Sequence, residues 1–372
     1  MKIALVANSD WNLYGYRLAL IQELRQQGHL LTLISPPGRY VKQLQDLGVV
    51  WLPIKMARRG ANPVRELLSL IQLFRIYRRA GFDLVHHFTI KCVIYGSFAA
   101  KAARLRAVVN SITGLGHIYV SQKPLAGLAR VLVNFLYRLS LNKTIVVFQN
   151  SNDREYFLKK RIVHTEQAEL IRGSGVDIDK FTYQPEPTGL PQIIMVSRFL
   201  WNKGIREFVE AAQQINSETL VAEFILVGDV DPGNPDSIPV NLIKSWTAKR
   251  GIKWIGWNEN MPQIYAGSNI VCLPTYYGEG LPKVLIEAAA SGRASITTDM
   301  PGCREVVRHE LNGMLIPPKD VPALVKSILF LIQNPVVREK MGRAGRGIAE
   351  QEFSSRRVNQ KTMTLYGELT KK

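Results

Sequence analysis

Short apolar runs alternate with longer amphipathic segments along almost the whole chain. The apolar run 2–7 precedes a helical pattern over 17–27, residues 8–15 are expected to form a loop between them, and a second apolar run covers 30–34. Short runs that are apolar on both faces are typical of strands in a parallel sheet covered by helices. The alternation therefore predicts an α/β fold with doubly wound sheets.

Further strands are expected in both halves of the chain. They cover 49–54, 84–88, 108–112, 144–148, 163–171, 192–196, 223–227, 252–255, 270–273 and 294–297. A proline-rich stretch, 183–191, separates the two sets and has the composition of a linker. We therefore predict an N-terminal domain over 1–182, a second domain over 191–352 and a C-terminal helix over 353–372.

Charge and cysteine content limit the location and the partners of the protein. The net charge is +18, and the interval 84–152 contains no acidic residue, so the first domain carries much of the excess. Nucleic acid, an anionic membrane or an acidic substrate could each meet such a surface. The three cysteines form no C-x-x-C pair, which favours a reducing compartment over disulfides or zinc. Neither a signal peptide nor a membrane-spanning helix is expected.

The stretch 274–292, PTYYGEGLPKVLIEAAASG, combines a strand end, a glycine-rich loop and a helix. Pro282 suits the first turn of that helix, because its missing N–H group would have no helical partner there. The free N–H groups of a helix start favour an anion such as a diphosphate. Glu279 and Glu287 flank this start, and a buried Glu287 would need a partner. From the residues alone, Glu287 could equally cap a neighbouring loop while Glu279 is solvated.

The spacing of Glu279 and Glu287 resembles the signature of the family 4 retaining glycosyltransferases, which have the GT-B fold. This resemblance implies two Rossmann-like domains that face a central cleft, with the C-terminal helix crossing back to the first domain. In that family the first glutamate meets the donor sugar and the second holds the ribose of the nucleotide. The chain departs from many members at Leu281-Pro282, where they have Phe-Gly.

Arg198 and Lys203 lie in the string VSRFLWNKG, which follows an expected strand and resembles the family's pair of cations. On their own, two cations in a loop are usually solvated, but the family's pair neutralises the diphosphate of the nucleotide as it leaves. The resemblance implies that both cations and both glutamates bind the nucleotide-sugar together with Gly228, Ile255, Trp257, Gly280, Leu281, Pro282 and Lys283.

Two further motifs bear on the chemistry. His117, in the string TGLGH, matches a loop histidine that contacts the transferred sugar in relatives, although an ordinary loop histidine is the alternative. The string Asp229-Val230-Asp231 spells a D-x-D metal motif. The family needs no metal, so we expect no metal site, and Asp229 is expected to cap the loop that follows. The predicted catalytic set is Glu279, His117, Arg198 and Lys203.

Shared strings at 114–119, 201–208 and 279–288 most resemble bacterial members of the family that act on undecaprenyl-diphosphate-linked saccharides. The resemblance implies retaining, metal-independent transfer of a sugar, for example N-acetylgalactosamine, from a UDP-sugar. The acceptor would be a polyprenyl-diphosphate-linked saccharide in N-glycan, O-antigen or capsule assembly, and no cofactor is expected. A soluble acceptor and a GT-B nucleotide-sugar isomerase are the alternatives. Nucleic-acid binding would explain the charge but not the order of the two cations and two glutamates.

A basic first domain predicts attachment to an anionic membrane. The resemblance implies that this membrane surface is the cytoplasmic face of the bacterial inner membrane. The segment 124–141 is expected to be a helix with apolar residues at helical spacing, namely Leu128, Val131, Leu132, Phe135 and Leu139, and only Arg130 and Arg138 as charges. A buried helix is the alternative for this segment. It would leave unexplained the cations Lys55, Arg58, Arg59, Arg75, Arg78 and Arg79.

Overall fold

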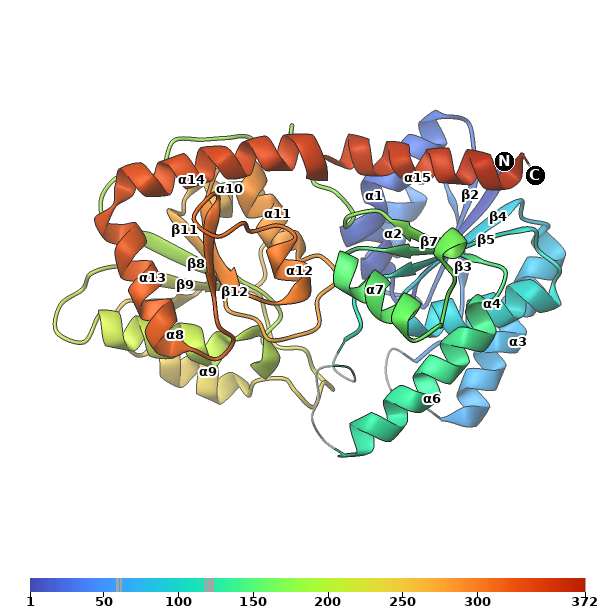
Figure 1. Ribbon diagram of the computed structural model, residues 1–372, viewed down its shortest axis with the longest axis horizontal. Helices are drawn as coiled ribbons and strands as arrows, with labels where there is room; N and C mark the ends of the chain where they lie inside the picture. Colours follow the sequence, from blue (N-terminus) through green and yellow to red (C-terminus); the bar gives the residue numbers. More distant parts are fainter. Residues whose placement is uncertain (58–59, 61, 117–118, 120–123, 372) are drawn as a thin grey trace. The chain divides into compact units, whose positions relative to one another are not determined.

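The computed structural model describes residues 1–57, 60, 62–116, 119 and 124–371. The chain divides into two compact units (Figure 1). Unit 1 contains Met1–Ser174 and Ser355–Lys372, and unit 2 contains Gly175–Ser354. Each unit is built on a parallel sheet with helices against it, as the alternating pattern predicts.

The sheet of unit 1 has the strand order β3-β2-β1-β4-β5-β6-β7 and is parallel throughout. Its strands are β1 (Lys2–Val6), β2 (Leu30–Ser35), β3 (Val50–Pro53), β4 (Leu84–Phe88), β5 (Ala107–Ile112), β6 (Ile145–Phe148) and β7 (Ala168–Leu170). The chain order reverses between β1 and β4, which makes their carboxyl ends a topological switch point.

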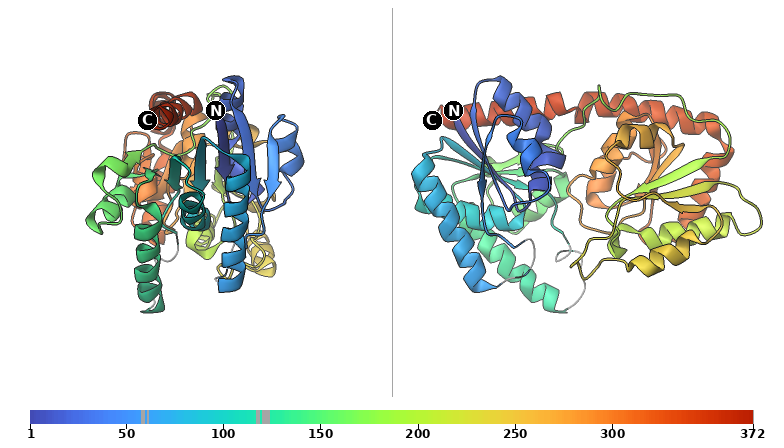
Figure 2. Two further views of the ribbon diagram at one scale, coloured as in Figure 1. Left: turned by 90° about the vertical axis from the view of Figure 1, so that its right-hand side faces the viewer. Right: turned by 180° about the vertical axis from the view of Figure 1, so that it is seen from behind.

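Helices cover both faces of this sheet (Figure 2). They are α1 (Asp10–Gln26), α2 (Val41–Gln45), α3 (Pro63–Ala80), α4 (Ile90–Ala102), α6 (Pro124–Leu141), α7 (Ser151–Lys159), the short η1 (Thr165–Gln167) and α15 (Ser355–Thr370). Because side chains alternate along a strand, Leu5 packs with α1 and α15, whereas Ala4 and Val6 pack with α3 and α4.

The predicted loop over 8–15 is wrong, because α1 already begins at Asp10. The side chain of Ser9 accepts a hydrogen bond from the N–H of Asn12 at 3.2 Å and so caps the helix; such a cap stabilises a helix by about 1 kcal/mol. Gly15 lies within this helix and next to the Trp11 ring, and a Cβ atom at this position would lie only 2.8 Å from that ring. The glycine therefore provides space inside the helix.

The sheet of unit 2 has the order β10-β9-β8-β11-β12-β13 and is also parallel. Its strands are β8 (Gln192–Val196), β9 (Glu223–Val227), β10 (Ile252–Trp254), β11 (Ile270–Leu273), β12 (Ala294–Thr298) and β13 (Gly313–Ile316), the last of which was not expected. The helices are η2 (Trp201–Lys203), α8 (Ile205–Ile215), α9 (Val240–Thr247), α10 (Met261–Ala266), α11 (Lys283–Ala290), α12 (Pro301–Arg304), α13 (Val321–Gln333), α14 (Pro335–Ile348) and the π-helix η3 (Ala349–Phe353).

The division between the units falls between Ser174 and Gly175, earlier than the proline-rich stretch where we expected the linker. Val176 and Phe181 are buried in the core of unit 2, which holds the segment there. The proline-rich stretch also packs on unit 2, because Glu186 forms a buried ion pair with Arg338 at 2.6 Å. At the other end of the chain, α15 packs beside α1 in unit 1.

Within the described residues, no single helix combines the length and the apolar character needed to cross a membrane. By length and composition alone, the pair Val321–Gln333 and Pro335–Phe353 would pass together, but it is bent by 101°.

Candidate donor-sugar site

The predicted site residues of unit 2 lie on loops after its central strands. The loop that follows β8 carries Arg198 and Lys203, and the loop that follows β11 carries Glu279 and leads into α11. Since β8 and β11 are neighbours in the sheet, the two loops leave the same edge. This edge is where open parallel sheets bind their ligands.

Lys203 and Glu279 form an ion pair between Nζ and Oε1. Their side chains are only 11% and 15% exposed, so the two charges neutralise each other in a largely desolvated place. The ammonium also lies 4.9 Å from the centre of the Tyr277 ring. Gly204 makes the approach of the two loops possible, because it has φ 83° and a Cβ atom there would lie 2.1 Å from the carbonyl oxygen of Pro274.

Arg198 pairs with an aspartate of the D-x-D string. Its Nη1 lies 2.7 Å from Oδ2 of Asp231, which is buried, while the arginine remains 42% exposed. Asp231 also accepts a hydrogen bond from the side chain of Asn234 at 3.1 Å, and its own N–H donates to the Ser237 hydroxyl. The Asp229 carboxylate accepts the N–H of Val230, the next residue of the loop, at 2.8 Å, whereas Asp231 forms the longer-range contacts within that loop.

The Asp231 carboxylate therefore binds the guanidinium group of Arg198 and the Asn234 side chain of its own loop. Across the described ranges of the chain, no group of three or more His, Cys, Asp or Glu side chains is arranged to hold a metal ion.

Glu287 is buried on α11 and has two partners. The Tyr265 hydroxyl donates to Oε2 at 3.0 Å, and Nζ of Lys283 lies 3.8 Å from Oε1. Burial raises the pKa of Glu287, and the neighbouring Lys283 is the largest influence in the other direction. Its partners are side chains rather than a loop backbone, so the alternative of loop capping is not what the structure shows. Pro282 is the N-cap residue of α11, one position before the helix.

The ends of β9 and β10 supply the remaining predicted contacts. A Cβ atom at Gly228 would lie 2.0 Å from the carbonyl oxygen of Ser197, so a glycine is needed for the loops after β8 and β9 to touch. The indole N–H of Trp254 donates to the Gly228 carbonyl at 2.8 Å. Ile255 and Trp257 are each 44% exposed, which leaves apolar surface beside this strand edge.

The backbone at Gly280 packs closely against the backbone at Gly302. A Cβ atom at Gly302 would lie 2.5 Å from the carbonyl oxygen of Gly280, which ties the segment before α11 to the start of α12 (Pro301–Arg304). Leu281 is buried in the core of unit 2 and anchors the same segment. Leu281 thus contributes packing, while Lys283 contributes the charge near Glu287.

Sequence reasoning missed the residues that position the predicted ones. Asn202 is buried, and its backbone carbonyl accepts hydrogen bonds from the Tyr276 N–H at 3.0 Å and from the Thr275 hydroxyl at 3.1 Å. These bonds join η2 to the loop after β11. Tyr265, the partner of Glu287, lies on α10. No local spacing signal marks either residue, because each contact joins segments that are distant in sequence.

His117 lies outside the described residues, and its role stays a prediction. In the same region of unit 1, the Tyr119 hydroxyl donates to Oδ1 of Asn134 on α6 at 2.7 Å.

Comparison with known proteins identifies related families. Residues 178–348 match the family of glycosyl transferases group 1, and residues 2–151 match a glycosyl transferase 4-like family. The chain is 25% identical to N,N'-diacetylbacillosaminyl-diphospho-undecaprenol alpha-1,3-N-acetylgalactosaminyltransferase of Campylobacter jejuni, with 100% of each chain covered. It is also 25% identical to UDP-Gal:alpha-D-GlcNAc-diphosphoundecaprenol alpha-1,3-galactosyltransferase of Escherichia coli, over 75% of this chain and 74% of that one.

Solved structures share the fold. A glycosyltransferase from Rickettsia africae superposes with a TM-score of 0.81 at 20% identity, covering 99% of this chain and 98% of that chain. Anabaena HepE, solved in complex with UDP and glucose, gives a TM-score of 0.78 at 18% identity, covering 98% of this chain and 99% of that one.

The two parallel sheets and these neighbours define the GT-B fold. The chain belongs to the glycosyltransferases that combine a glycosyl transferase 4-like N-terminal part with a group 1 C-terminal part. The predicted fold class, the predicted family and the predicted enzyme class are thereby confirmed.

Proposed function

We propose that this enzyme transfers a sugar from a UDP-sugar to a polyprenyl-diphosphate-linked saccharide, with retention of configuration and without a metal ion. The observation that carries the proposal is the Lys203–Glu279 ion pair, which joins the loops after β8 and β11 at the start of α11. The full-length similarity to a transferase whose name specifies an undecaprenyl-diphosphate acceptor supports the choice of acceptor.

The donor diphosphate would lie at the start of α11, with Arg198 and Lys203 as its cations. A phosphate oxygen that replaces Glu279 beside Lys203 would leave the Glu279 carboxylate to accept hydrogen bonds from hydroxyls of the transferred sugar. Arg198 is oriented by Asp231, and Lys203 lies over the Tyr277 ring, so both cations would be near the leaving phosphate and would stabilise the charge that develops on it.

Glu287 would bind the hydroxyls of the ribose through its carboxylate, whose position Tyr265 fixes. Exposed apolar surface at Ile255 and Trp257 would lie against the base. The acceptor hydroxyl would attack from the face that the diphosphate leaves, and a leaving phosphate oxygen would take its proton. This scheme assigns no covalent role to a protein side chain.

Membrane attachment through unit 1 is the second part of the proposal. On α6, Leu128, Val131 and Leu132 are 72%, 67% and 58% exposed, so these side chains do not belong to a buried helix. Helix α3 also exposes apolar residues, with Val64 67% and Leu67 57% exposed. Both helices pack on α4.

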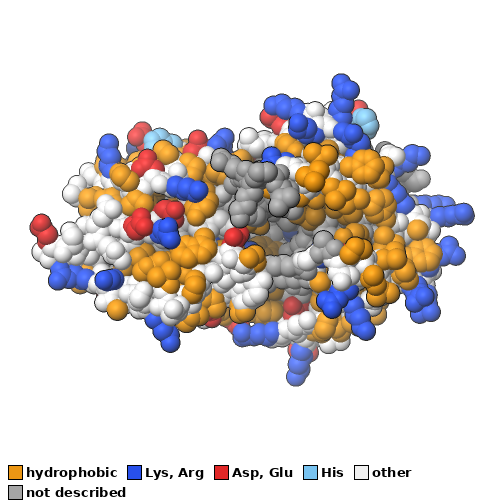
Figure 3. All heavy atoms as spheres, turned by 90° about the horizontal axis from the view of Figure 1, so that it is seen from below, with side chains coloured by type: hydrophobic (Ala, Val, Ile, Leu, Met, Phe, Trp, Pro, Cys, Tyr) orange, Lys and Arg blue, Asp and Glu red, His pale blue; other side chains and the backbone are white. Residues whose placement is uncertain are grey.

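Basic residues accompany these apolar side chains. Arg75, Arg78 and Arg79 are exposed on α3, and Lys55 is exposed just after β3. Figure 3 shows apolar side chains interspersed with Lys and Arg over the part of the view that contains unit 1. Each cation near an anionic leaflet contributes about 1 kcal/mol of attraction. Arg58 and Arg59, which belong to the predicted basic cluster, lie outside the described residues.

Acceptor-dependent release of UDP tests the function. We expect the protein to release UDP from a UDP-sugar when a polyprenyl-diphosphate-linked saccharide is added, and the product to keep the anomeric configuration of the donor. Equal rates with the same saccharide freed from its lipid would favour the soluble-acceptor alternative. Conversion of the UDP-sugar in the absence of any acceptor would favour an isomerase.

A further inference from the structure

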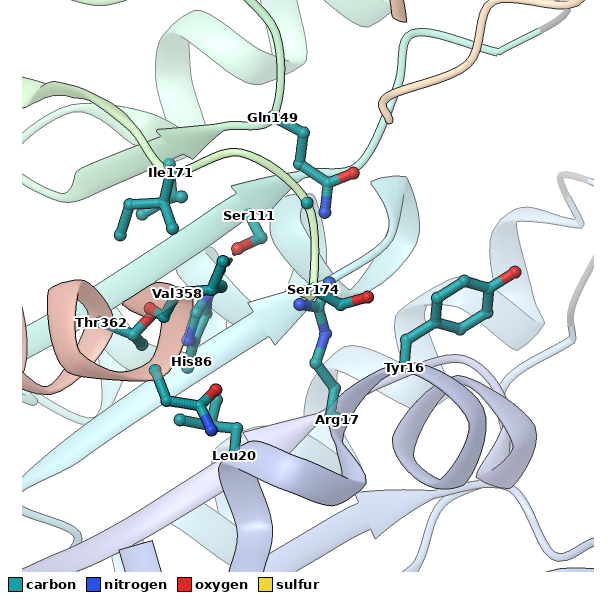
Figure 4. Close-up of a pocket in the computed structure, with 13 residues that line it drawn as sticks. Tyr16, Arg17, Leu20, His86, Ser111, Gln149, Ile171, Ser174, Val358 and Thr362 are labelled. Atoms are coloured by element: carbon teal, nitrogen blue, oxygen red, sulfur yellow. Dashed lines mark hydrogen bonds between the residues drawn. The ribbon is translucent and has the colours of Figure 1, made fainter. Parts of the chain in front are cut away.

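Unit 1 contains a polar cavity between its sheet and the helices α1 and α15 (Figure 4). Its volume is about 20 Å³, which gives room for one atom the size of a water oxygen. Arg17, His86, Gln149, Ser174 and Asn359 contribute to its wall. The cavity reaches the surface beside Tyr16, which also lines it and is 40% exposed.

Arg17 places an uncompensated positive charge in this wall. The residue is only 7% exposed, and its guanidinium carbon lies 4.1 Å from the centre of the Phe88 ring. Its Nε atom is buried without a hydrogen-bond partner, and within the described residues no carboxylate pairs with the side chain. Burial lowers the pKa of Arg17 to about 10, so the guanidinium still carries its charge at neutral pH.

Two amide side chains line the same cavity. Gln149 is 7% exposed and Asn359 is 4% exposed, and each can offer an N–H donor to a group that occupies the space. Figure 4 shows Arg17 and Gln149 pointing toward Ser174 from opposite sides. Buried polar groups are nearly always hydrogen-bonded, so the buried Arg17 Nε without a partner beside this space indicates a missing one.

His86 does not provide that partner. Its Nδ1 lies 2.5 Å from the Tyr366 hydroxyl and its Nε2 lies 2.7 Å from the Ser111 hydroxyl, so both ring nitrogens are occupied. Burial and the nearby Arg17 lower the pKa of His86, so the ring is neutral at neutral pH. The charge of Arg17 therefore remains unbalanced unless an anion enters.

We propose that this cavity is an anion site that accepts one oxygen of a phosphate group, with Arg17 as the counter-charge and Gln149 and Asn359 as N–H donors. A water molecule would satisfy hydrogen bonds but would leave a buried cation, which is costly. The volume admits a single oxygen atom, so the rest of the phosphate group lies at the opening beside Tyr16. Charge-assisted hydrogen bonds to phosphate are the strong ones, and guanidinium groups suit them.

Two sources share this chemistry, namely free phosphate and the diphosphate of the lipid-linked acceptor. The second source rests on the proposed function, whereas the anion site itself does not. Binding of inorganic phosphate can therefore be measured without any transferase assay, which keeps a failure of the site distinct from a failure of the function.

The test compares thermal unfolding of the full chain in inorganic phosphate and in sodium chloride of equal ionic strength. We expect phosphate to raise the Tm of the wild-type protein, and Arg17→Met to bind phosphate at least tenfold more weakly. Arg17→Met keeps the apolar stem over Phe88 and removes the charge. Arg25→Met is the matched control, because Arg25 is exposed on the same helix, and it should respond to phosphate like the wild type.

Gln149→Met provides a second variant that retains the cation and should weaken phosphate binding severalfold. The proposal is overturned if phosphate stabilises the wild type no more than chloride does, or if it stabilises Arg17→Met equally. A KM for the lipid-linked acceptor that rises tenfold in Arg17→Met, with an unchanged KM for the UDP-sugar, identifies the acceptor diphosphate as the source. Loss of phosphate binding with both KM values unchanged identifies free phosphate.

Discussion

At the scale of single residues, the Lys203–Glu279 ion pair is the centre of the proposed donor site. Lys203→Ala and Glu279→Ala should each lower kcat by about 10² or more, because each removes a preorganised charge from the transition state. Steady-state UDP release measures the effect, and circular dichroism checks the fold. Lys253→Ala is a suitable control, since Lys253 pairs with Glu223 on an exposed strand edge. Near-normal turnover in both site variants would contradict the assignment.

Asp231 allows a test of metal dependence at the same scale. Because its carboxylate is paired with Arg198, we expect saturating EDTA to leave UDP release largely unchanged. An enzyme that EDTA inactivates and Mg²⁺ restores would instead support the D-x-D interpretation, and Asp231→Asn would then abolish the restoration.

Glu287 predicts a pH dependence of stability. Its pKa is raised above the ordinary value of 4.5 by burial, so the folded protein holds this proton more tightly than the unfolded chain does. Its contribution to the free energy of unfolding therefore falls as pH rises from about 4.5 through the folded-state pKa. Glu287→Gln should remove this component in urea titrations between pH 4.5 and 7, and should also weaken stabilisation by UDP. A wild-type pH profile that the substitution leaves unchanged would contradict the argument.

At the scale of elements, the exposed apolar face of α6 determines how unit 1 would meet a membrane. Leu132→Asp with Phe135→Asp should reduce co-sedimentation with anionic liposomes several-fold, because the substitutions place charge on the apolar face. Leu311→Asp is the matched control, since Leu311 is an exposed leucine of unit 2. Binding to anionic liposomes should also weaken as salt rises. Equal binding by the site variant and the control would argue against this face.

The elements also show where local patterns suffice. The bounds of α6 follow directly from the sequence, because a proline opens a long run at helical spacing. Helix α1 begins earlier than expected. Gly15 suggests a loop, but Ser9 caps the helix and lets it begin before this glycine. Strand β13 escaped prediction because GMLI is short and begins with a glycine, which packs against the Ser295 carbonyl of β12.

At the scale of the whole molecule, the chain returns to its first unit through α15. The hydroxyl of Tyr366 on this helix is hydrogen-bonded to Nδ1 of His86, and both residues are buried. Tyr366→Phe therefore leaves a buried ring nitrogen without its partner. We expect the free energy of unfolding of unit 1 to fall by about 1–3 kcal/mol. Urea titration measures this, with Tyr183→Phe on the exposed part of unit 2 as the control. An unchanged midpoint would show that the hydroxyl contributes nothing to the docking of α15.

The sequence by itself determined the two parallel sheets and the family, and it predicted the residues of the proposed donor site in unit 2. These follow from local signals, since apolar runs, glycines and charges at fixed spacing act within one strand, loop or helix. Only the tertiary structure decided the partners. Asp231 for Arg198 and Tyr265 for Glu287 each come from a segment distant in sequence.

The Arg17 cavity is the clearest case of what the sequence could not disclose. Arg17 reads as one more charge on an amphipathic helix, and Gln149 and Asn359 read as ordinary polar residues. Packing of the sheet against α1 and α15 buries all three around one space, because desolvation depends on what surrounds a residue rather than on its neighbours along the chain.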